Sequence, residues 1–267
     1  MMRRAWQSTC LILSAAALLA GCSTVKSFSA QDVADSAPTA AAPKNGAVPN
    51  LDATLRQAAA DAEAGYKYGE AANHYTTLLQ RYPDDETILL ALARNFRFAG
   101  SPQQAIQVVN ARITKAGVKP TLLVELGKDY LAADQLNLAI PALTQAKNLT
   151  PGDWEIYSAL GVAYDYQGQY AQAQEAYQAG LMLVPTNPEL LNNYALSLAQ
   201  SGQLDTAIAT LQQAINQPSA SAQMRQNLAL LLAFKGDKDG AIRLVRMDLP
   251  DEMARNNINY YQGLGGN

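Results

Sequence analysis

A step of 34 residues recurs along most of this chain, and it limits the possible folds more than any other feature of the sequence. One frame consists of Leu160, Gly161, Tyr164, Ala173, Tyr177 and Pro185. One step back lie Leu126, Gly127, Tyr130, Ala139, Leu143 and Pro151. About six frames run over residues 52–255 without an insertion. A fixed period of this length indicates an array of stacked supersecondary units.

Each frame contains two amphipathic helices. In the frame described above, Tyr157, Leu160 and Tyr164 share one helical stripe, Gly168 lies in a polar break, and Tyr177 belongs to the stripe of a second helix. Such a hairpin cannot bury its own apolar stripe and needs a similar neighbour. The period and the alternation of small and large residues resemble the tetratricopeptide repeat (TPR). The resemblance implies an all-α fold: a right-handed superhelical solenoid of about six TPR hairpins.

Two prolines interrupt the pattern. Pro141 falls near the start of the second helix of the third frame, where we expect a missing backbone N–H to cost little. Pro250 should end or bend the second helix of the sixth frame. The apolar residues that follow it, including Ile258, Tyr260 and Tyr261, predict a C-terminal capping helix, with its end and a loose tail in residues 256–267.

The first residues have the pattern of a secretory signal. Arg3 and Arg4 precede a short apolar run, which is too short to span a bilayer and ends in Leu18-Leu19-Ala20-Gly21-Cys22. This ending resembles a bacterial lipobox, so residues 1–21 are expected to be removed and Cys22 lipidated. The alternative is an ordinary signal peptide that happens to contain a cysteine. Because Ser23 and not Asp follows Cys22, analogy with enteric lipoproteins favours a lipid anchor at the periplasmic face of the bacterial outer membrane.

Residues 22–51 are rich in Ser, Ala and Pro, and we predict that they form a disordered tether after the lipidated cysteine. Cys10 leaves with the signal, so no disulfide or cysteine–metal site is expected in the mature chain. Loss of Arg3 and Arg4 would also lower the net charge from −3 to −5. An acidic chain of this kind does not favour a nucleic-acid partner.

The sequence gives little indication of catalysis, and we expect neither enzymatic activity nor a cofactor or metal. His74 is the single histidine and has no acidic or nucleophilic partner nearby in sequence. Residues 237–240 match only a fragment of a calcium loop. An enzyme with an unrecognised site is kept as an alternative, which His74→Ala would test.

A binding role is better supported, because the first helix of each TPR hairpin lines the concave face by analogy. The apolar candidates there are larger than a solvated face needs, and the charges are mostly basic in the first half and acidic in the second. Such a groove suits an amphipathic helix or an extended peptide. The alternative is that the apolar members are only semi-buried packing residues. The candidates are Arg56, Leu90, Arg94, Arg97, Phe98, Val124, Lys128, Leu131, Val162, Asp165, Tyr166, Glu189, Asn192, Leu196, Gln226, Leu230 and Phe234, with Glu155 at the rim.

The combination of lipobox, tether and repeats resembles lipoproteins that assemble outer-membrane machines. The helix start at 226–230, the Asp248-Leu249-Pro250 turn and the closing Asn257-Ile258-Asn259-Tyr260-Tyr261 are similar to the TadD-like lipoproteins of tight-adherence (Tad/Flp) pilus assembly. That resemblance implies a pilotin-like scaffold whose partner is a secretin or another pilus-assembly component. The alternatives are an adaptor for cell-wall enzymes and another pilotin or outer-membrane assembly lipoprotein.

Overall fold

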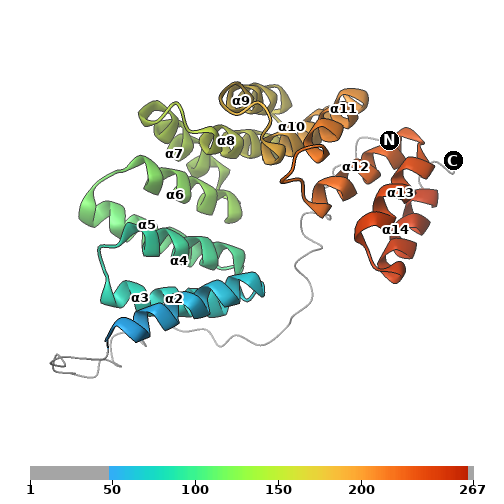
Figure 1. The fold of residues 1–267 in the computed structure, drawn as a ribbon. Coiled ribbons are helices and arrows are strands. Elements are labelled where there is room, and N and C mark those ends of the chain that lie inside the picture. Colours follow the sequence, from blue (N-terminus) through green and yellow to red (C-terminus); the bar gives the residue numbers. More distant parts are fainter. Residues whose placement is uncertain (1–47, 264–267) are drawn as a thin grey trace. The chain divides into compact units, whose positions relative to one another are not determined.

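The computed structural model describes residues 48–263, and every regular element in that range is a helix (Figure 1). The signal segment, Cys22 and residues 22–47 of the predicted tether lie outside the described residues. Residues 48–51, predicted as the end of the tether, form the first turn of helix α2. The helices are α2 (Val48–Ala64), α3 (Tyr68–Arg81), α4 (Glu86–Phe98), α5 (Pro102–Ala116), α6 (Pro120–Ala132), α7 (Leu136–Leu149), α8 (Trp154–Tyr166), α9 (Tyr170–Leu183), α10 (Pro188–Gln200), α11 (Leu204–Ile215), α12 (Ala222–Lys235), α13 (Lys238–Asp248) and α14 (Asp251–Gly263).

Consecutive helices pair into hairpins, from α2–α3 to α12–α13, and α14 follows the last hairpin (Figure 1). Each hairpin turn contains one residue with a left-handed backbone conformation, and these residues recur at the 34-residue step. Four of the positions are glycine, which adopts this conformation without steric strain. Tyr66 and Asp134 occupy the other two, with φ of 57° in both. The six positions are Tyr66, Gly100, Asp134, Gly168, Gly202 and Gly236.

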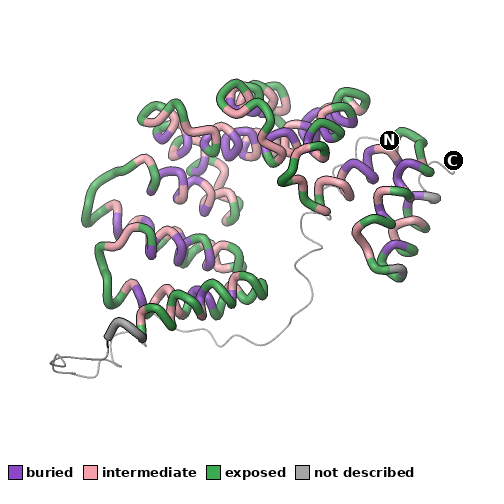
Figure 2. Tube along the Cα trace, viewed as in Figure 1, coloured by how far each residue is buried: buried purple, intermediate pink, exposed green. Residues whose placement is uncertain are grey.

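The interior of each hairpin is closed by a small residue on the first helix and a larger one on the second, 16 positions later. In α8–α9, a Cβ atom added to Gly161 would lie 2.4 Å from Cε1 of Tyr177. In α6–α7, a Cβ on Gly127 would lie 2.5 Å from Cγ of Leu143. Both large residues are buried, and buried segments face one another across the hairpins (Figure 2). The small residues of the repeat pattern therefore lie where the two helices of these hairpins approach closely, as expected.

Successive hairpins meet mainly where the second helix of one packs against the first helix of the next, as α5 does against α6 and α7 against α8. The first helices also touch one another, since α4 contacts α6, α6 contacts α8, and α8 contacts α10. Polar side chains cross some of these junctions. Asn95 Nδ2 donates to Glu63 Oε1 at 2.6 Å, and Arg97 Nη1 donates to Asp129 Oδ1 at 2.5 Å. In each pair the two residues lie 32 positions apart. The junctions are thus built from one repeating geometry with different side chains.

The expectation for Pro141 was wrong. Helix α7 begins at Leu136, so Pro141 lies beyond the N-terminal positions whose N–H groups lack a partner inside the helix. It removes a helical hydrogen bond, although its side chain is exposed and leaves the packing of α7 intact.

The end of the array is covered as predicted. Helix α14 buries Ala254 and Tyr261 in a cluster with Ala229, Ala233 and Val245 of the last hairpin. Tyr260, by contrast, remains 44% exposed. Arg225 also ties α12 to the end of α13, because its Nε and Nη2 atoms donate to both carboxylate oxygens of Asp248. Helix α14 and this ion pair close the last hairpin.

Candidate partner-binding site

We use the term first-helix face for the accessible sides of α2, α4, α6, α8, α10 and α12, from which the predicted groove residues come. The structure divides these residues by burial. Val124 and Leu230 are buried core residues, 8% and 5% exposed, so their prediction as groove surface is corrected. Val124 packs in the cluster that joins α6 and α7 to α8, and Leu230 packs in the cluster formed by α12, α13 and α14.

Other apolar candidates are half-buried. Leu90, Leu131, Val162 and Phe234 each pack against one of the hydrophobic clusters. Leu196 is also half-buried, as is Gln226. These side chains therefore stabilise the array and still present part of their surface, which combines the two alternatives that the sequence left open. The exposed members of the predicted set are Arg56, Arg94, Phe98, Tyr166 and Glu189, together with Glu155 at the rim.

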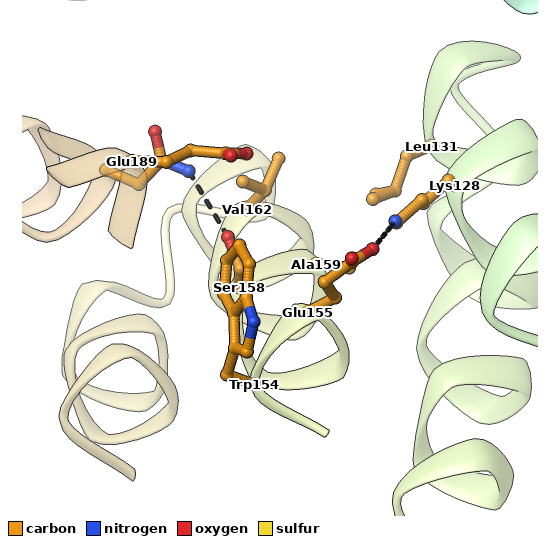
Figure 3. A pocket seen from close by; sticks show the side chains of 9 residues that line it. Lys128, Leu131, Trp154, Glu155, Ser158, Ala159, Val162 and Glu189 are labelled. Carbon is orange, nitrogen blue, oxygen red and sulfur yellow. Dashed lines mark hydrogen bonds and ion pairs between the residues drawn. The ribbon is translucent and has the colours of Figure 1, made fainter. Parts of the chain in front are cut away.

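A hollow of about 340 Å³ lies on the first-helix face between α6, α8 and α10 (Figure 3). Four predicted groove residues line it: Lys128 and Leu131 of α6, Val162 of α8 and Glu189 of α10. Glu155, predicted at the rim, also lines it. The structure thus brings five predicted residues from three hairpins to one concave site.

The remaining lining residues were not predicted; they are Trp154, Ser158, Ala159 and Asn193. The 34-residue step could have indicated one of them, since Ser158 is the equivalent of the predicted residue Val124. Asn193 Nδ2 donates to Ser158 Oγ at 3.3 Å, which links α10 to α8 beside the hollow (Figure 3). Small polar residues were overlooked because the sequence search favoured large or charged side chains.

One ion pair crosses the hollow's edge. Lys128 Nζ lies 2.5 Å from Glu155 Oε2, and this contact joins α6 to α8 (Figure 3). Glu189 stands on the opposite side, next to Val162, and none of the described residues forms an ion pair or hydrogen bond with its carboxylate. Since the side chain of Glu189 is exposed, this negative charge is available to a bound molecule.

Two other predicted groove charges, Arg97 and Arg56, have acidic partners within the protein. Arg97 is only 12% exposed and donates from Nη1 to Glu125 Oε1 at 2.6 Å as well as to Asp129. Asp129 is fully buried, so burial outweighs the attraction of the guanidinium and raises the pKa of Asp129 to about 7. Arg56 lies 3.9 Å from Asp85 at its nearest atoms. The predicted basic first half is therefore less basic at the surface than its composition indicates.

Asp165 belongs to a hairpin junction and not to an open groove. Its carboxylate accepts hydrogen bonds from Ser197 Oγ at 2.6 Å and from the Tyr177 hydroxyl at 2.9 Å. Burial raises the pKa of Asp165 to about 6, although both hydrogen bonds act in the opposite direction. Asn192 likewise crosses a junction, because its Oδ1 accepts from Asn227 Nδ2 at 2.9 Å.

Phe98 lies in a small aromatic cluster near the turn of the first hairpin. Its ring centroid is 5.0 Å from that of Tyr68, and the Arg97 guanidinium lies 5.5 Å from its centroid. Tyr68 in turn meets Tyr66 edge to face at 6.3 Å. Phe98 and Tyr66 are 47% and 80% exposed, so this cluster offers apolar contact area outside the hollow.

His74 and the 237–240 turn, the two candidates for catalysis or metal binding, are ordinary parts of the helical hairpins. His74 is half-buried on α3. Asp237 accepts a hydrogen bond from the Gly240 backbone N–H at 2.8 Å and so caps α13. Over residues 48–263, we find no cluster of three or more His, Cys, Asp or Glu side chains suited to a metal ion. No helix in the same range has the length and apolar character needed to cross a membrane.

The sequence model of the tetratricopeptide repeat family matches residues 124–188, 158–223 and 195–247. Tetratricopeptide repeat protein 13 of Homo sapiens is 25% identical over 155 residues, which cover 56% of this chain. The chain spans only 18% of the length of that curated relative.

Solved structures show the same fold. A thermophilic TPR protein of Thermus thermophilus, TTC0263, superposes with a TM-score of 0.58 at 21% identity, covering 66% of this chain and 98% of the other. A chain of the APC/C hetero-tetramer Cut9-Hcn1 gives a TM-score of 0.64 at 18% identity, covering 80% of this chain and 43% of the other. With its stacked helical hairpins and the family match over residues 124–247, this chain contains tetratricopeptide repeats and has the fold of a TPR solenoid.

Proposed function

We propose that this protein is a lipid-anchored scaffold that binds a segment of a partner protein on its first-helix face during assembly of an outer-membrane machine. The observation that carries the binding proposal is the hollow between α6, α8 and α10. It combines the apolar side chains of Leu131 and Val162 with the exposed and unpaired carboxylate of Glu189. A peptide could bury apolar surface there and form a charged contact at the same time.

The membrane part of the proposal is supported by the lipobox ending at Cys22 and by Ser23 after it. Acylation of Cys22 would hold the chain at the periplasmic face of the outer membrane, with three acyl chains by analogy with bacterial lipoproteins. Several chains together give effectively permanent anchoring. If residues 22–47 are flexible, their average reach is about 30 Å, so the repeats could work clear of the lipid surface.

The pilus part of the proposal is supported by the C-terminal resemblance to Tad/Flp assembly lipoproteins. Under this proposal the partner is a secretin or another pilus-assembly component, and the protein helps the secretin reach or assemble in the outer membrane. Three residues of the resembling stretches also have structural roles: Asp248 pairs with Arg225, Leu249 packs beside the last cluster, and Tyr261 is buried in it.

The test is a cross-linked affinity purification of the lipidated protein from its own cell envelope, with mass spectrometry. We expect a secretin and pilus-assembly proteins to be enriched by the unmodified protein. Glu189→Lys should reduce their recovery, because it reverses the free charge of the hollow. Glu175→Lys is the matched control, because Glu175 is exposed on α9, a second helix.

Other outcomes would contradict separate parts of the proposal. Enrichment of peptidoglycan hydrolases or synthases, without pilus proteins, would replace the pilus assignment with a cell-wall adaptor. Equal recovery by Glu189→Lys and the unmodified protein would move the binding site away from the hollow. If Cys22→Ser left the distribution between membrane and soluble fractions unchanged, the lipid anchor would be wrong.

A further inference from the structure

The Lys128–Glu155 ion pair occupies two positions that recur in every hairpin, and the sequence changes at these positions along the array. The first series, on the C-terminal half of each first helix, is Arg94, Lys128, Val162 and Leu196. The second series, at the start of the following first helix, is Thr121, Glu155, Glu189 and Gln223. Only Lys128 and Glu155 form a pair of opposite charges, with their atoms 2.5 Å apart.

The neighbouring pairs are each half complete. Before the complete pair, Arg94 has Thr121 at the acid position. After it, Glu189 has Val162 at the cation position. Both Arg94 and Glu189 are exposed, and no ion pair with either is found among the described residues. Burial and the nearby Glu63 raise the pKa of the Tyr75 hydroxyl, and the charge of Arg94 partly opposes this rise, so Arg94 acts there only as a nearby charge.

We infer that the first-helix face binds a peptide carrying an acidic residue that pairs with Arg94, a central apolar residue, and a basic residue that pairs with Glu189. This inference rests on the proposed function and specifies the chemistry of its partner. The bound peptide would supply the two charges that the repeats lack. Its apolar residue would contact Leu131 and Val162, which line the hollow between the two charged ends.

The spacing of the two charges in the peptide follows from the helix packing. Packed helices lie about 8–10 Å apart, and Arg94 on α4 and Glu189 on α10 are three hairpin steps apart, which corresponds to about 27 Å. An extended chain rises about 3.3 Å per residue, so the acidic and basic residues should be separated by about eight residues. The fixed order of the charges on the face also gives the peptide one preferred direction.

The face itself indicates why the middle of the peptide should be apolar and uncharged. Lys128 and Glu155 neutralise each other, so they offer no net charge to the segment that crosses them. Around them, Ala159, Leu131 and Val162 provide apolar surface. Burying a charge in that part would remove it from water without a partner and would oppose binding.

Fluorescence anisotropy with synthetic peptides of about twelve residues tests the inference. One peptide carries Glu, Leu and Lys in this order, with Glu and Lys separated by about eight residues. A second carries them in the reverse order, and a third replaces both charges by Gln. We expect one charged order to bind about three- to fivefold more tightly for each charge that it satisfies than the Gln peptide does. The preference should weaken as salt is added.

Variants of the protein test which of its residues pairs with each charge of the peptide. Glu189→Gln should remove the preference for the peptide lysine, and Arg94→Gln should remove the preference for the peptide glutamate. Glu175→Gln and Arg243→Gln are the matched controls, since both lie exposed on second helices and should leave the preferences unchanged.

Val162→Lys is the sharpest variant. It reproduces at Val162 and Glu189 the pair that Lys128 and Glu155 already form, so Glu189 would be neutralised internally. The preference for the peptide lysine should then disappear while the protein remains folded, because the lysine stem can cover the same apolar surface. Val162→Gln removes the same apolar contact without supplying a charge, and it should keep the preference.

The outcomes separate this inference from the proposed function. Tight binding of the Gln peptide in the hollow, equal to that of the charged peptides, would overturn the charge pairing and leave the scaffold proposal standing. Equal binding of the two charge orders would have the same meaning. Binding of none of the peptides would overturn the inference, whereas the scaffold proposal is decided by the envelope purification.

Discussion

The interior of the α8–α9 hairpin and the junction between α4 and α6 solve the same packing problem in opposite ways. Inside the hairpin, Gly161 meets Tyr177 with no room for a further carbon atom. At the junction, Arg97 joins Glu125 and Asp129 through charged hydrogen bonds. The hairpin interior depends on shape and the junction on charge. The comparison indicates which contacts every repeat must keep and which are free to vary.

The variation is visible at the junction positions themselves. Leu131 and Ala163 are the equivalents of Arg97 and Asp129 one step later, and there both positions are apolar. Within the hairpins, by contrast, every pair 16 residues apart combines a Gly or Ala with a larger residue, such as Ala195 with Leu211. A junction can therefore exchange charged for apolar contacts without changing the fold, whereas a hairpin interior can only adjust its sizes.

The largest effect is expected from breaking the charged junction. Arg97→Leu would leave Glu125 and Asp129 without their cation, and removing one partner of a buried ion pair costs about 3–5 kcal/mol. We expect this loss in the free energy of unfolding at pH 8, measured by urea denaturation and circular dichroism. At pH 5 the loss should be smaller, because Asp129, with a pKa of about 7, is then protonated.

A compensated variant sharpens this test. The triple variant Arg97→Leu/Glu125→Ala/Asp129→Ala copies the equivalent Leu131, Ala159 and Ala163 of the next junction. We expect it to recover most of the stability, since an apolar replacement of a whole buried ion pair is often neutral or stabilising. A triple variant as unstable as Arg97→Leu would show that the junctions are not interchangeable.

A smaller effect, of about 3 kcal/mol, is expected from the titration of Asp165 at the α8–α10 junction. Its pKa is raised to about 6 in the folded protein and is about 3.9 in an unfolded chain, so the folded state binds the proton more tightly. The stabilisation is complete below about pH 4 and is lost as the pH rises to about 6. Asp129 acts in the same direction up to about pH 7.

Asp165→Asn should remove the Asp165 share of this pH dependence, which chemical denaturation at pH 4, 5, 6 and 7 can measure. Asp134→Asn is the control, because Asp134 is exposed and its φ of 57° is well tolerated by asparagine. The same slope in Asp165→Asn and in the unmodified protein would mean that Asp165 titrates alike in the folded and unfolded states.

The smallest of the three effects concerns the hairpin interior. Gly161→Ala should lower the free energy of unfolding by about 1–3 kcal/mol, because the new Cβ would force Tyr177 out of its place. Gly152→Ala is the matched control, since a Cβ there would meet nothing within 4 Å. Thermal and urea unfolding of the two variants can be compared directly.

A double variant tests whether the stability of the hairpin interior depends only on the sizes of the paired side chains. Gly161→Ala/Tyr177→Leu reproduces the Ala195–Leu211 pair of the next hairpin, and we expect it to be more stable than Gly161→Ala alone. It also removes the hydroxyl that donates to Asp165, so recovery should be partial. A double variant less stable than Gly161→Ala would show that this hydrogen bond outweighs the steric relief.

Much of the fold could be predicted from the sequence because its information is periodic. The 34-residue step identified Gly161, Tyr177, Gly127 and Leu143 as members of the packed stripes, and the helices begin and end close to the expected positions. Pro141 was misjudged because its effect depends on where α7 begins, a boundary that periodicity does not fix to within one turn. The membrane anchor at Cys22 lies outside the described residues and remains a prediction.

The candidate site was predicted only in part. Sequence analogy selected the first helices of the hairpins, and Lys128, Leu131, Val162 and Glu189 from these helices do line one hollow. It did not separate these residues from Val124 and Leu230, which are buried, or from Arg97 and Asp165, which belong to junctions. Analogy gives the helix face on which a residue lies, but the depth of its side chain depends on the neighbouring hairpin.

The sequence by itself determined the repeat, the helical hairpins and the small-to-large contacts inside them, because these depend on spacings within one 34-residue unit. Only the tertiary structure decided which charges stay free. Arg97 is neutralised by residues 28 and 32 positions later, and Lys128 by a residue 27 positions later. Whether such side chains meet depends on how far adjacent helices are separated and in which direction each side chain points. Glu189 keeps its charge exposed because Val162 stands where a cation would neutralise it.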